Sequence, residues 1–471
     1  MVFSSLIFTF IFLPIVLTLY YLSKDKYRNY ILLFASLYFY SYGEPKFVLI
    51  MIGSIICNYL IALMIDKYRQ KQVSAILLFL SVVLNIGILF IYKYLDFSIS
   101  ILNIFFKTHL QIFEIALPIG ISFFTFQALS YVIDVYRGSV KVQKNPLFVA
   151  LYISFFPQLI AGPIVRYSTI EDQITNRKCT LEGFGQGGKR FLLGFSKKVI
   201  LANNLSIIAS EIFDMDAATT NPLLLWIGSI CFSLQIFYDF SGYSDMAIGL
   251  GQLFGFTFLE NFDYPYISKS VTEFWRRWHM SLGQWFRDYV YIPLGGSKVS
   301  VPRHILNMFI VWMLTGIWHG ANYTFIIWGL GYFILLVVEK YIVTPDKRSF
   351  IISSIVWRLV TILAVNFGWV IFNSKGWKEA LRYCLAMIGH YNISPVINGE
   401  LVRYLREYGF FLIAGILFST PIVKHLELKL VGTKVSYVSA IVSPFIYGLI
   451  FLWAVSFILL GAHNPFIYFN F

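Results

Sequence analysis

Residues 274–296 read FWRRWHMSLGQWFRDYVYIPLGG and combine three arginines, one histidine and three tryptophans. The rest of the chain is of a very different character, since the whole sequence is 58% hydrophobic and only 13% charged. Its mean hydropathy is +0.71. A soluble globular domain carries about 25% charged residues. The composition therefore predicts an integral membrane protein in which this stretch is an unusually polar and aromatic element.

The apolar segments predict an all-α, polytopic protein. A transmembrane helix needs roughly 20 mostly apolar residues, and the chain offers about 11–13 transmembrane or re-entrant segments of this kind. No separate soluble domain is expected, so residues 1–471 are interpreted as one membrane domain. The N-terminal run from Met1 to Leu22 lacks a basic start and a small-residue cleavage site, which indicates a retained first span rather than a signal peptide.

The formal net charge of +13 is explained by short basic loops between apolar runs. Such loops belong on the cytoplasmic side, which suits Ser23–Arg28, Asp66–Lys71, Asp134–Lys144 and Arg166–Lys198. Phe213–Pro222 has two acidic residues and no basic one, and we expect it outside. This alternation predicts an extracytoplasmic N-terminus. Contact with anionic lipid is expected, and no nucleic-acid partner is needed to explain the charge.

A segment broken by proline and glycine lies at residues 146–163. Pro157, Gly162 and Pro163 interrupt it, and both of its flanks are expected on the cytoplasmic side. A re-entrant element fits better than a full span. Irregular backbone at membrane depth is tolerated only inside protein or beside a water-filled cavity, so the segment predicts a cavity.

The cysteines and the common motifs exclude several kinds of site. The four cysteines lie far apart, without CxxC or zinc spacing. Neither a metal site nor a permanently bound cofactor is expected. The sequence contains no HExxH, GxSxG, P-loop or GxGxxG motif, so metalloprotease, serine hydrolase, ATPase and dinucleotide-binding functions lack support. The cysteines are Cys57, Cys179, Cys231 and Cys384.

The stretch at 274–296 is predicted to be a single amphipathic helix. Ser270 and Glu273 form an S-x-x-E capping box directly before it, and Pro293 ends it. The apolar face of such a helix consists of Phe274, Trp278, Leu282, Trp285 and Tyr289. An aromatic helix with basic flanks lies in or near the membrane interface.

On a helical wheel, Arg276 and Arg287 lie together on one polar flank, and Arg277 lies with Asp288 on another. His279 lies at the margin of the apolar face. An interfacial anchor explains most of the stretch, and a lone histidine in this position is more often structural than catalytic.

A second histidine strengthens the functional interpretation. Ile305–Val338 is a run of 34 residues without Asp, Glu, Lys or Arg, longer than the roughly 17–25 residues of one span. The break is expected at GIWHGAN, which contains His319. An ionisable residue at membrane depth is a functional-site hypothesis by default. A desolvated, neutral imidazole can act as a general base, although a histidine bonded to a backbone carbonyl remains the alternative.

Two acidic residues interrupt the apolar run Leu223–Leu259. Asp239 and Asp245 lie in the sequence YDFSGYSD and are the only charged residues of the run Leu223–Leu259. Buried acids need partners, which nearby arginines could supply. Structural ion pairs are the first interpretation, and residues lining a substrate route are the second.

Together these segments resemble the membrane-bound O-acyltransferase superfamily, in particular its bacterial alginate and peptidoglycan O-acetyltransferase branch. The resemblance rests on YDFSGYSDMAIGLGQLFGF, on ENFDYPYISKSVTEFWRRWHMSLGQWFRDYVYIPLGG and on TGIWHGANYTFIIWG. It extends over nearly the whole chain. It implies a helical bundle with a central tunnel, and an invariant histidine that corresponds to His319. The second polar residue of the family corresponds to His279.

The resemblance further implies an acetyl transfer from a cytoplasmic thioester, with acetyl-CoA as the donor substrate, to an extracytoplasmic polysaccharide. His319 would take the proton of the attacking hydroxyl, and His279 would orient the carbonyl or stabilise the oxyanion. A separate SGNH-type transferase outside the membrane is the implied partner, and a bacterial cytoplasmic membrane the implied location. Further candidates for binding the donor or the substrate are Arg276, Arg277, Arg287, Trp318, Asn322, Asp239 and Asp245.

Two alternatives remain open at this point. One is a D-alanyl transferase for teichoic acid, which uses a carrier-protein thioester and the same chemistry. The other is a polysaccharide or lipid transporter, for which many spans and a cavity would also suit. Internal repeats are frequent in transporters, and the chain has no second copy of the WHG or FWRRWH segments.

Overall fold

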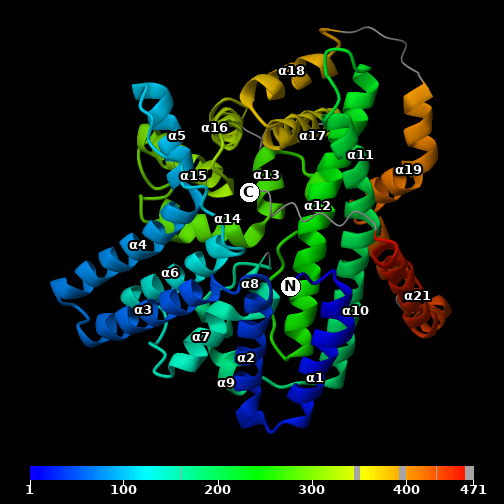
Figure 1. Cartoon of the computed structure of the whole chain (residues 1–471). Coiled ribbons are helices and arrows are strands. Elements are labelled where there is room, and N and C mark those ends of the chain that lie inside the picture. Colours follow the sequence, from blue (N-terminus) through cyan, green and yellow to red (C-terminus); the bar gives the residue numbers. More distant parts are fainter. Residues whose placement is uncertain (161, 344–350, 392–398, 431, 462–471) are drawn as a thin grey trace. The chain divides into compact units, whose positions relative to one another are not determined.

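The computed structural model describes residues 1–160, 162–343, 351–391, 399–430 and 432–461. All regular elements in this part of the chain are helices (Figure 1), which confirms the all-α prediction. Seven of these helices are long and apolar enough to cross a membrane, and two shorter apolar helices are Phe8–Leu22 and Leu95–Phe106. The other described helices are either shorter or less apolar than these seven.

Two compact units can be distinguished, and the first comprises Met1–Phe191 and Met246–Leu259. It contains a π-helical turn at Phe8–Phe12, the nine helices named below, the first part of α10 (Leu181–Ser196) and the end of α12 (Pro222–Leu253). The nine are α1 (Leu13–Leu22), α2 (Asp25–Gly43), α3 (Val48–Lys67), α4 (Gln72–Lys93), α5 (Leu95–Phe106), α6 (Ile121–Arg137), α7 (Pro146–Ser154), α8 (Phe156–Leu159) and α9 (Tyr167–Asn176).

Helices α3 and α4 are joined by a buried polar cluster. The Asn58 amide donates to Asn85 Oδ1 over 3.2 Å, and the Asn85 amide donates back to Asn58 Oδ1 over 2.8 Å. Ser81 donates its hydroxyl to Asn58 Oδ1. Helices in lipid gain little from burying apolar surface against each other, so such bonds and close packing hold them together.

The segment expected to be re-entrant is divided into two short helices. α7 ends at Ser154 and α8 begins at Phe156, and the backbone of Phe155 between them is not helical. The Phe156 N–H donates to the Ser36 hydroxyl on α2, and the Gln158 amide donates to the Tyr152 carbonyl. The irregular backbone is thus hydrogen-bonded within protein, as membrane depth requires.

The long helix α12 ends in a Schellman motif. The Phe256 N–H donates to the Gly251 carbonyl, and the Gly255 N–H donates to the Gln252 carbonyl. Gly255 has φ +81°, a left-handed conformation that glycine adopts without a steric cost. The sequence LGQLFGF therefore ends the helix at Gly255, whose positive φ allows the chain to turn.

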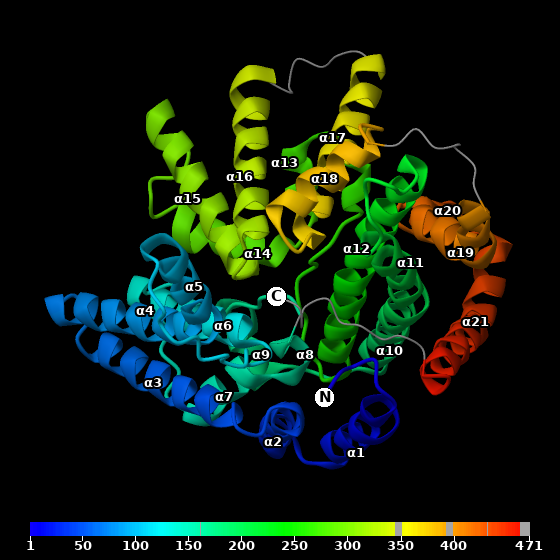
Figure 2. The ribbon, with the colours of Figure 1, turned by 45° about the horizontal axis from the view of Figure 1, so that its top comes forward.

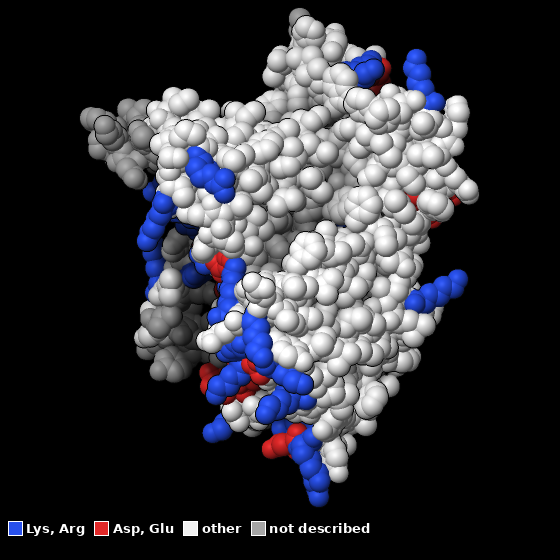
Figure 3. All heavy atoms as spheres, turned by 90° about the vertical axis from the view of Figure 1, so that its left-hand side faces the viewer, with Lys and Arg blue, Asp and Glu red and all other residues white. Residues whose placement is uncertain are grey.

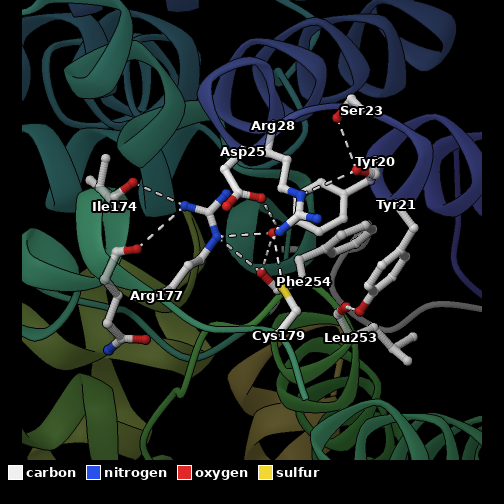
Figure 4. Close-up of polar contacts among 11 residues, drawn as sticks. Tyr20, Tyr21, Ser23, Asp25, Arg28, Ile174, Arg177, Cys179, Leu253 and Phe254 are labelled. Carbon is white, nitrogen blue, oxygen red and sulfur yellow. Dashed lines mark hydrogen bonds and ion pairs between the residues drawn. The ribbon is translucent and has the colours of Figure 1, made fainter. Parts of the chain in front are cut away.

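Side chains from α1 and from the segment after α9 bind the last carbonyls of α12 (Figure 4). The Tyr20 hydroxyl donates to the Phe254 carbonyl over 2.7 Å, and Arg177 Nε donates to the same carbonyl over 3.0 Å. The Tyr21 hydroxyl donates to the Leu253 carbonyl. A cationic group near a helix C-terminus also interacts favourably with the helix dipole, so this contact fixes three segments at one point.

The second unit comprises Leu192–Asp245 and Glu260–Phe471, and Figure 2 shows its helices α13 to α18 in one group. It also contains π-helical turns at Lys197–Ala202, Arg287–Tyr291 and Glu339–Val343 and a 3₁₀ turn at Pro265–Ile267. Its complete helices are α11 (Asn203–Phe213), α13 (Val271–Arg277), α14 (Met280–Phe286), α15 (Val301–His319), α16 (Tyr323–Val338), α17 (Ile351–Asn373), α18 (Trp377–Met387), α19 (Gly399–Phe418), α20 (Ile422–Leu430) and α21 (Lys434–Leu459).

The apolar run at 305–338 forms a tight helical hairpin, with α15 and α16 side by side (Figure 2). The predicted break is confirmed, since α15 ends at His319 and α16 begins at Tyr323. The two helices meet at glycines: a Cβ at Gly316 would lie 2.6 Å from the Phe325 carbonyl oxygen, and one at Gly329 would lie 2.6 Å from the Trp312 carbonyl oxygen. Small residues at the crossing let the two backbones approach.

Large parts of the surface in Figure 3 carry no charged side chain, while lysines and arginines gather in patches with a few acids. On α4 the exposed side chains are large and apolar, and Phe79 is 65% exposed. An apolar surface of this extent is unusual for a soluble protein. It suits helices that face lipid.

The glycine crossing gives a matched pair of variants. Gly329→Ala puts a methyl group against a backbone oxygen that cannot move aside, and we expect it to destabilise the protein by about 1–3 kcal/mol. Gly331→Ala, on the same helix, has no heavy atom within 4 Å of the added Cβ and serves as the control. Thermal unfolding in detergent should separate the two variants, and equal melting temperatures would contradict the close approach.

Candidate active site

The stretch at 274–296 is not one continuous helix as its sequence predicts. α13 ends at Arg277, α14 begins at Met280, and His279 between them has φ +44° and ψ +52°. This left-handed conformation is uncommon for a residue with a side chain, although histidine adopts it more readily than most. It costs of order 1–3 kcal/mol and persists only where the surroundings impose it. The single-helix prediction was wrong because a tertiary contact bends the chain here.

That contact comes from the segment before α13. The Met280 N–H donates to the Asn261 carbonyl over 2.9 Å, and both the N–H and the hydroxyl of Ser281 donate to Asn261 Oδ1. The Asp263 N–H donates to the Arg277 carbonyl over 3.0 Å. Asn261 is 2% exposed. These bonds hold both sides of His279 and offset the strain of its backbone.

The His279 imidazole is buried among aromatic rings. Its centroid lies 6.4 Å from that of Phe240, 6.1 Å from Phe262 and 6.2 Å from Trp318. Burial lowers the pKa of His279 to about 4, so the ring is neutral near pH 7. Its Nδ1 atom has no hydrogen-bond partner among the described residues. A buried ring nitrogen without a partner is uncommon.

His319 is the last residue of α15 and is half-buried. Its ring centroid lies 5.0 Å from those of Trp318 and Trp328 and 5.2 Å from that of Phe372. Trp318 contacts the rings of both His279 and His319. The structure therefore brings the two predicted histidines into contact with one indole, although they are 40 positions apart in the sequence.

The N-terminus of α13 is held more firmly than the capping box alone predicts. The Ser270 hydroxyl accepts from the Glu273 N–H over 3.0 Å, as predicted. The buried carboxylate of Glu339 accepts from the N–H groups of Val271 and Thr272. An anion is stabilised at a helix N-terminus. Nothing in the sequence near α13 indicates Glu339, which comes from the π-helical turn after α16.

The three arginines do not pair as the helical wheel suggests. Arg277 forms ion pairs with Asp263 and Glu273, and Arg287 pairs with the neighbouring Asp288. The left-handed residue at 279 changes the phase between α13 and α14, so the expected grouping of Arg277 with Asp288 was wrong. Arg276 is exposed.

The acidic residues of α12 are paired with lysines rather than with the expected arginines. Lys198 Nζ lies 2.6 Å from Asp239 Oδ1, and both side chains are at most 2% exposed. Lys197 Nζ lies 2.6 Å from Asp245 Oδ2. The two lysines begin the π-helical turn at Lys197–Ala202. These contacts support the structural interpretation of both acids.

The remaining predicted site residues are Asn322 and Trp318. Asn322 caps α16 by accepting from the Thr324 N–H, and its amide donates to the Lys375 carbonyl. Trp318 is buried beside both histidines. In the described part of the chain, no group of three His, Cys, Asp or Glu residues is arranged to hold a metal ion.

Comparison with known proteins now identifies the class. The family model of the membrane-bound O-acyltransferases matches residues 34–374, and the chain belongs to this family of acyltransferase enzymes. It is 41% identical to a probable alginate O-acetylase of Pseudomonas aeruginosa, over 93% of this chain and 82% of that protein. It is 33% identical to a peptidoglycan O-acetyltransferase of Helicobacter pylori, over 92% and 88% of the two chains.

A more limited similarity links it to a teichoic acid D-alanyltransferase of Bacillus subtilis, 33% identical over 55% of this chain and 69% of that protein. The family assignment and the apolar helices make this protein a multi-pass membrane acyltransferase. The transporter alternative is thereby set aside.

The buried ion pair can be tested by a double-mutant cycle. Lys198→Met leaves the Asp239 carboxylate buried without its cation, and we expect a loss of about 3–5 kcal/mol in stability. In Lys198→Met with Asp239→Leu no charge remains, so the double variant should recover most of that loss. Thermal unfolding in detergent of the wild type, Lys198→Met, Asp239→Leu and the double variant measures the cycle. A double variant no more stable than the single one would contradict a structural ion pair.

Proposed function

We propose that this protein transfers acetyl groups from a cytoplasmic thioester, acetyl-CoA, for the O-acetylation of an extracytoplasmic polysaccharide. The observation that carries the proposal is the pair of histidines around Trp318 in a chain similar over nine-tenths of its length to named O-acetylating proteins. Alginate-like polymers and peptidoglycan are the acceptor classes that these relatives suggest. The bacterial cytoplasmic membrane, with the N-terminus outside, is the location that the basic loops suggest.

In the proposed reaction His319 is the general base. A ring nitrogen takes the proton of the attacking hydroxyl while the hydroxyl oxygen bonds to the acetyl carbonyl carbon. The tetrahedral intermediate then collapses, the carbon–sulfur bond breaks, and the thiol of CoA leaves with the proton that His319 returns. The attacking hydroxyl belongs to the polymer itself or to a serine of an SGNH-type partner outside the membrane.

His279 is suited to a different role from His319. Because its pKa is lowered to about 4, the ring stays neutral and keeps one N–H that can donate to the acyl carbonyl oxygen. Charge develops on this oxygen during attack, so a donor fixed beforehand stabilises the transition state more than the ground state. The strained backbone at His279 suits a residue whose position matters more than its local stability.

We assign binding of the acyl donor to the basic side chains. Arg277 and Arg287 already pair with carboxylates, whereas Arg276 is exposed. Of the three, Arg276 is therefore the best placed to meet a CoA phosphate. The carrier-protein thioester of a D-alanyl transfer remains the second candidate donor, which the partial similarity to the Bacillus protein favours.

Replacement of His319 tests the proposed base. His319→Ala should lower the release of free CoA from acetyl-CoA by about 10²–10⁴-fold, measured with purified protein in liposomes that contain the acceptor. His390→Ala changes an exposed histidine and should leave the rate unchanged. Normal polymer acetylation by the His319 variant would reject the assignment. Activity only with an acylated carrier protein would instead support the D-alanyl alternative.

His279 offers a test that separates backbone strain from chemistry. His279→Gly and His279→Ala both remove the imidazole, so both should lower turnover by about 10²-fold or more. Glycine adopts a positive φ without the steric cost that alanine meets. The glycine variant should therefore melt at a higher temperature than the alanine variant. Full turnover by a well-folded glycine variant would contradict a catalytic role for His279.

A further inference from the structure

One face of α16 carries a row of buried polar side chains that the reaction scheme does not use. Thr324, Trp328 and Tyr332 are spaced four residues apart, so they follow one another along the same face of the helix. They are at most 2% exposed. The Thr324 hydroxyl, the Trp328 indole N–H and the Tyr332 hydroxyl have no hydrogen-bond partner among the described residues. The large majority of buried side-chain polar atoms in proteins are paired, so three such groups in one row on a helix face call for an explanation.

A fourth group of the same kind joins the row from α13. Trp275 Nε1 is also buried without a partner in the described part of the chain. The ring centroids of Trp275 and Trp328 are 5.4 Å apart, those of Trp275 and Tyr332 4.9 Å, and those of Trp328 and Tyr332 5.1 Å. Three unpaired donors are thus carried by three rings in mutual contact.

Two other buried tyrosines of this unit have hydroxyls that are hydrogen-bonded. The Tyr238 hydroxyl donates to the Gly415 carbonyl over 2.6 Å, and the Tyr383 hydroxyl donates to the Leu225 carbonyl over 3.0 Å. The Tyr332 hydroxyl instead packs against Gly368, where a Cβ would lie 2.6 Å from its oxygen. The missing side chain at 368 leaves room for this hydroxyl but offers it no acceptor.

The row of unpaired polar groups lies next to His319. The Trp328 ring centroid lies 5.0 Å from that of His319, and the two ring planes are nearly perpendicular. An indole N–H only donates, so its partner must be an acceptor such as a carbonyl oxygen. The surrounding rings exclude water and lower the local dielectric, which strengthens a hydrogen bond to an oxygen that is gaining charge.

We propose that Trp328 donates its indole N–H to the carbonyl oxygen of the transferring acyl group, as a second donor in addition to His279, and that Trp275 and Tyr332 hold the same acyl thioester through the neighbouring donors. This inference rests on the proposed function. As His319 takes the proton and the hydroxyl oxygen bonds to the carbonyl carbon, the electron pair of the carbonyl moves to its oxygen, where Trp328 meets it. When the carbon–sulfur bond breaks, the pair returns and the thiol leaves with the proton from His319.

Conservative substitutions test the catalytic part of the proposal. Trp328→Phe keeps an aromatic ring and removes the N–H, and we expect kcat to fall about 10²-fold with KM for the thioester little changed. Tyr332→Phe removes only a hydroxyl and should give a smaller fall. Trp312→Phe removes a comparable volume from the same cluster, where Trp312 contacts Trp275 and Tyr332, and should leave kcat within about threefold.

A binding experiment separates the hydrogen bond from packing. A CoA ketone analogue keeps the carbonyl oxygen, and a CoA thioether lacks it. Trp328→Phe should weaken binding of the ketone about 3–10-fold and leave that of the thioether unchanged. Equal weakening of both analogues, or an equal loss of kcat in Trp312→Phe, would overturn the proposal in favour of packing alone.

If wild type turned over and His319→Ala did not, but Trp328→Phe retained full kcat, this inference would fail while the proposed function stood. Absence of turnover by wild type would reject the proposed function itself.

Discussion

The left-handed backbone at His279 is the constraint on which the site depends. A continuous helix from Ser270 onward would give the imidazole a place on the helix margin, as the wheel suggests. Instead the bonds from Asn261 to Met280 and Ser281 stop one helix and start another. The turn directs the ring into the aromatic group of Phe240, Phe262 and Trp318. Strain at one residue is thus maintained by hydrogen bonds from a segment that lies outside both helices.

Hydrogen bonds and close backbone contacts position the elements around this turn, in addition to the apolar packing of Phe274 and Trp278. Glu339 and Ser270 satisfy the first N–H groups of α13, and glycines at 316 and 329 bring α15 and α16 together. In a membrane the apolar surface of a helix is as well placed against lipid as against another helix. Position must then come from hydrogen bonds, charges and steric fit, which are the interactions that this unit uses near its histidines.

The enclosure of the histidines by rings has a chemical consequence. For His279 the neutral imidazole is favoured because charge is poorly solvated there, and a neutral ring can accept one proton and donate another. The same enclosure makes each unpaired polar atom costly. The unpaired groups of Trp275, Trp328 and Tyr332 therefore stand out from a bundle in which Lys198 and Asp239 neutralise each other and most buried hydroxyls find a carbonyl. We interpret the three unpaired groups as binding positions for the proposed acyl thioester, because a buried polar group without a partner otherwise lowers stability.

The sequence alone determined the class of fold, because the length and spacing of apolar runs reflect the membrane directly. It also located the capping box at Ser270, the break after His319 and both histidines, since each is a local signal. It could not determine that the helix stops at His279, because the responsible bonds come from Asn261. Nor could it assign Lys198 to Asp239 or Glu339 to α13. A partner distant in the sequence leaves no periodicity to detect, so only the tertiary structure decided which polar groups meet and which stay unpaired among the described residues.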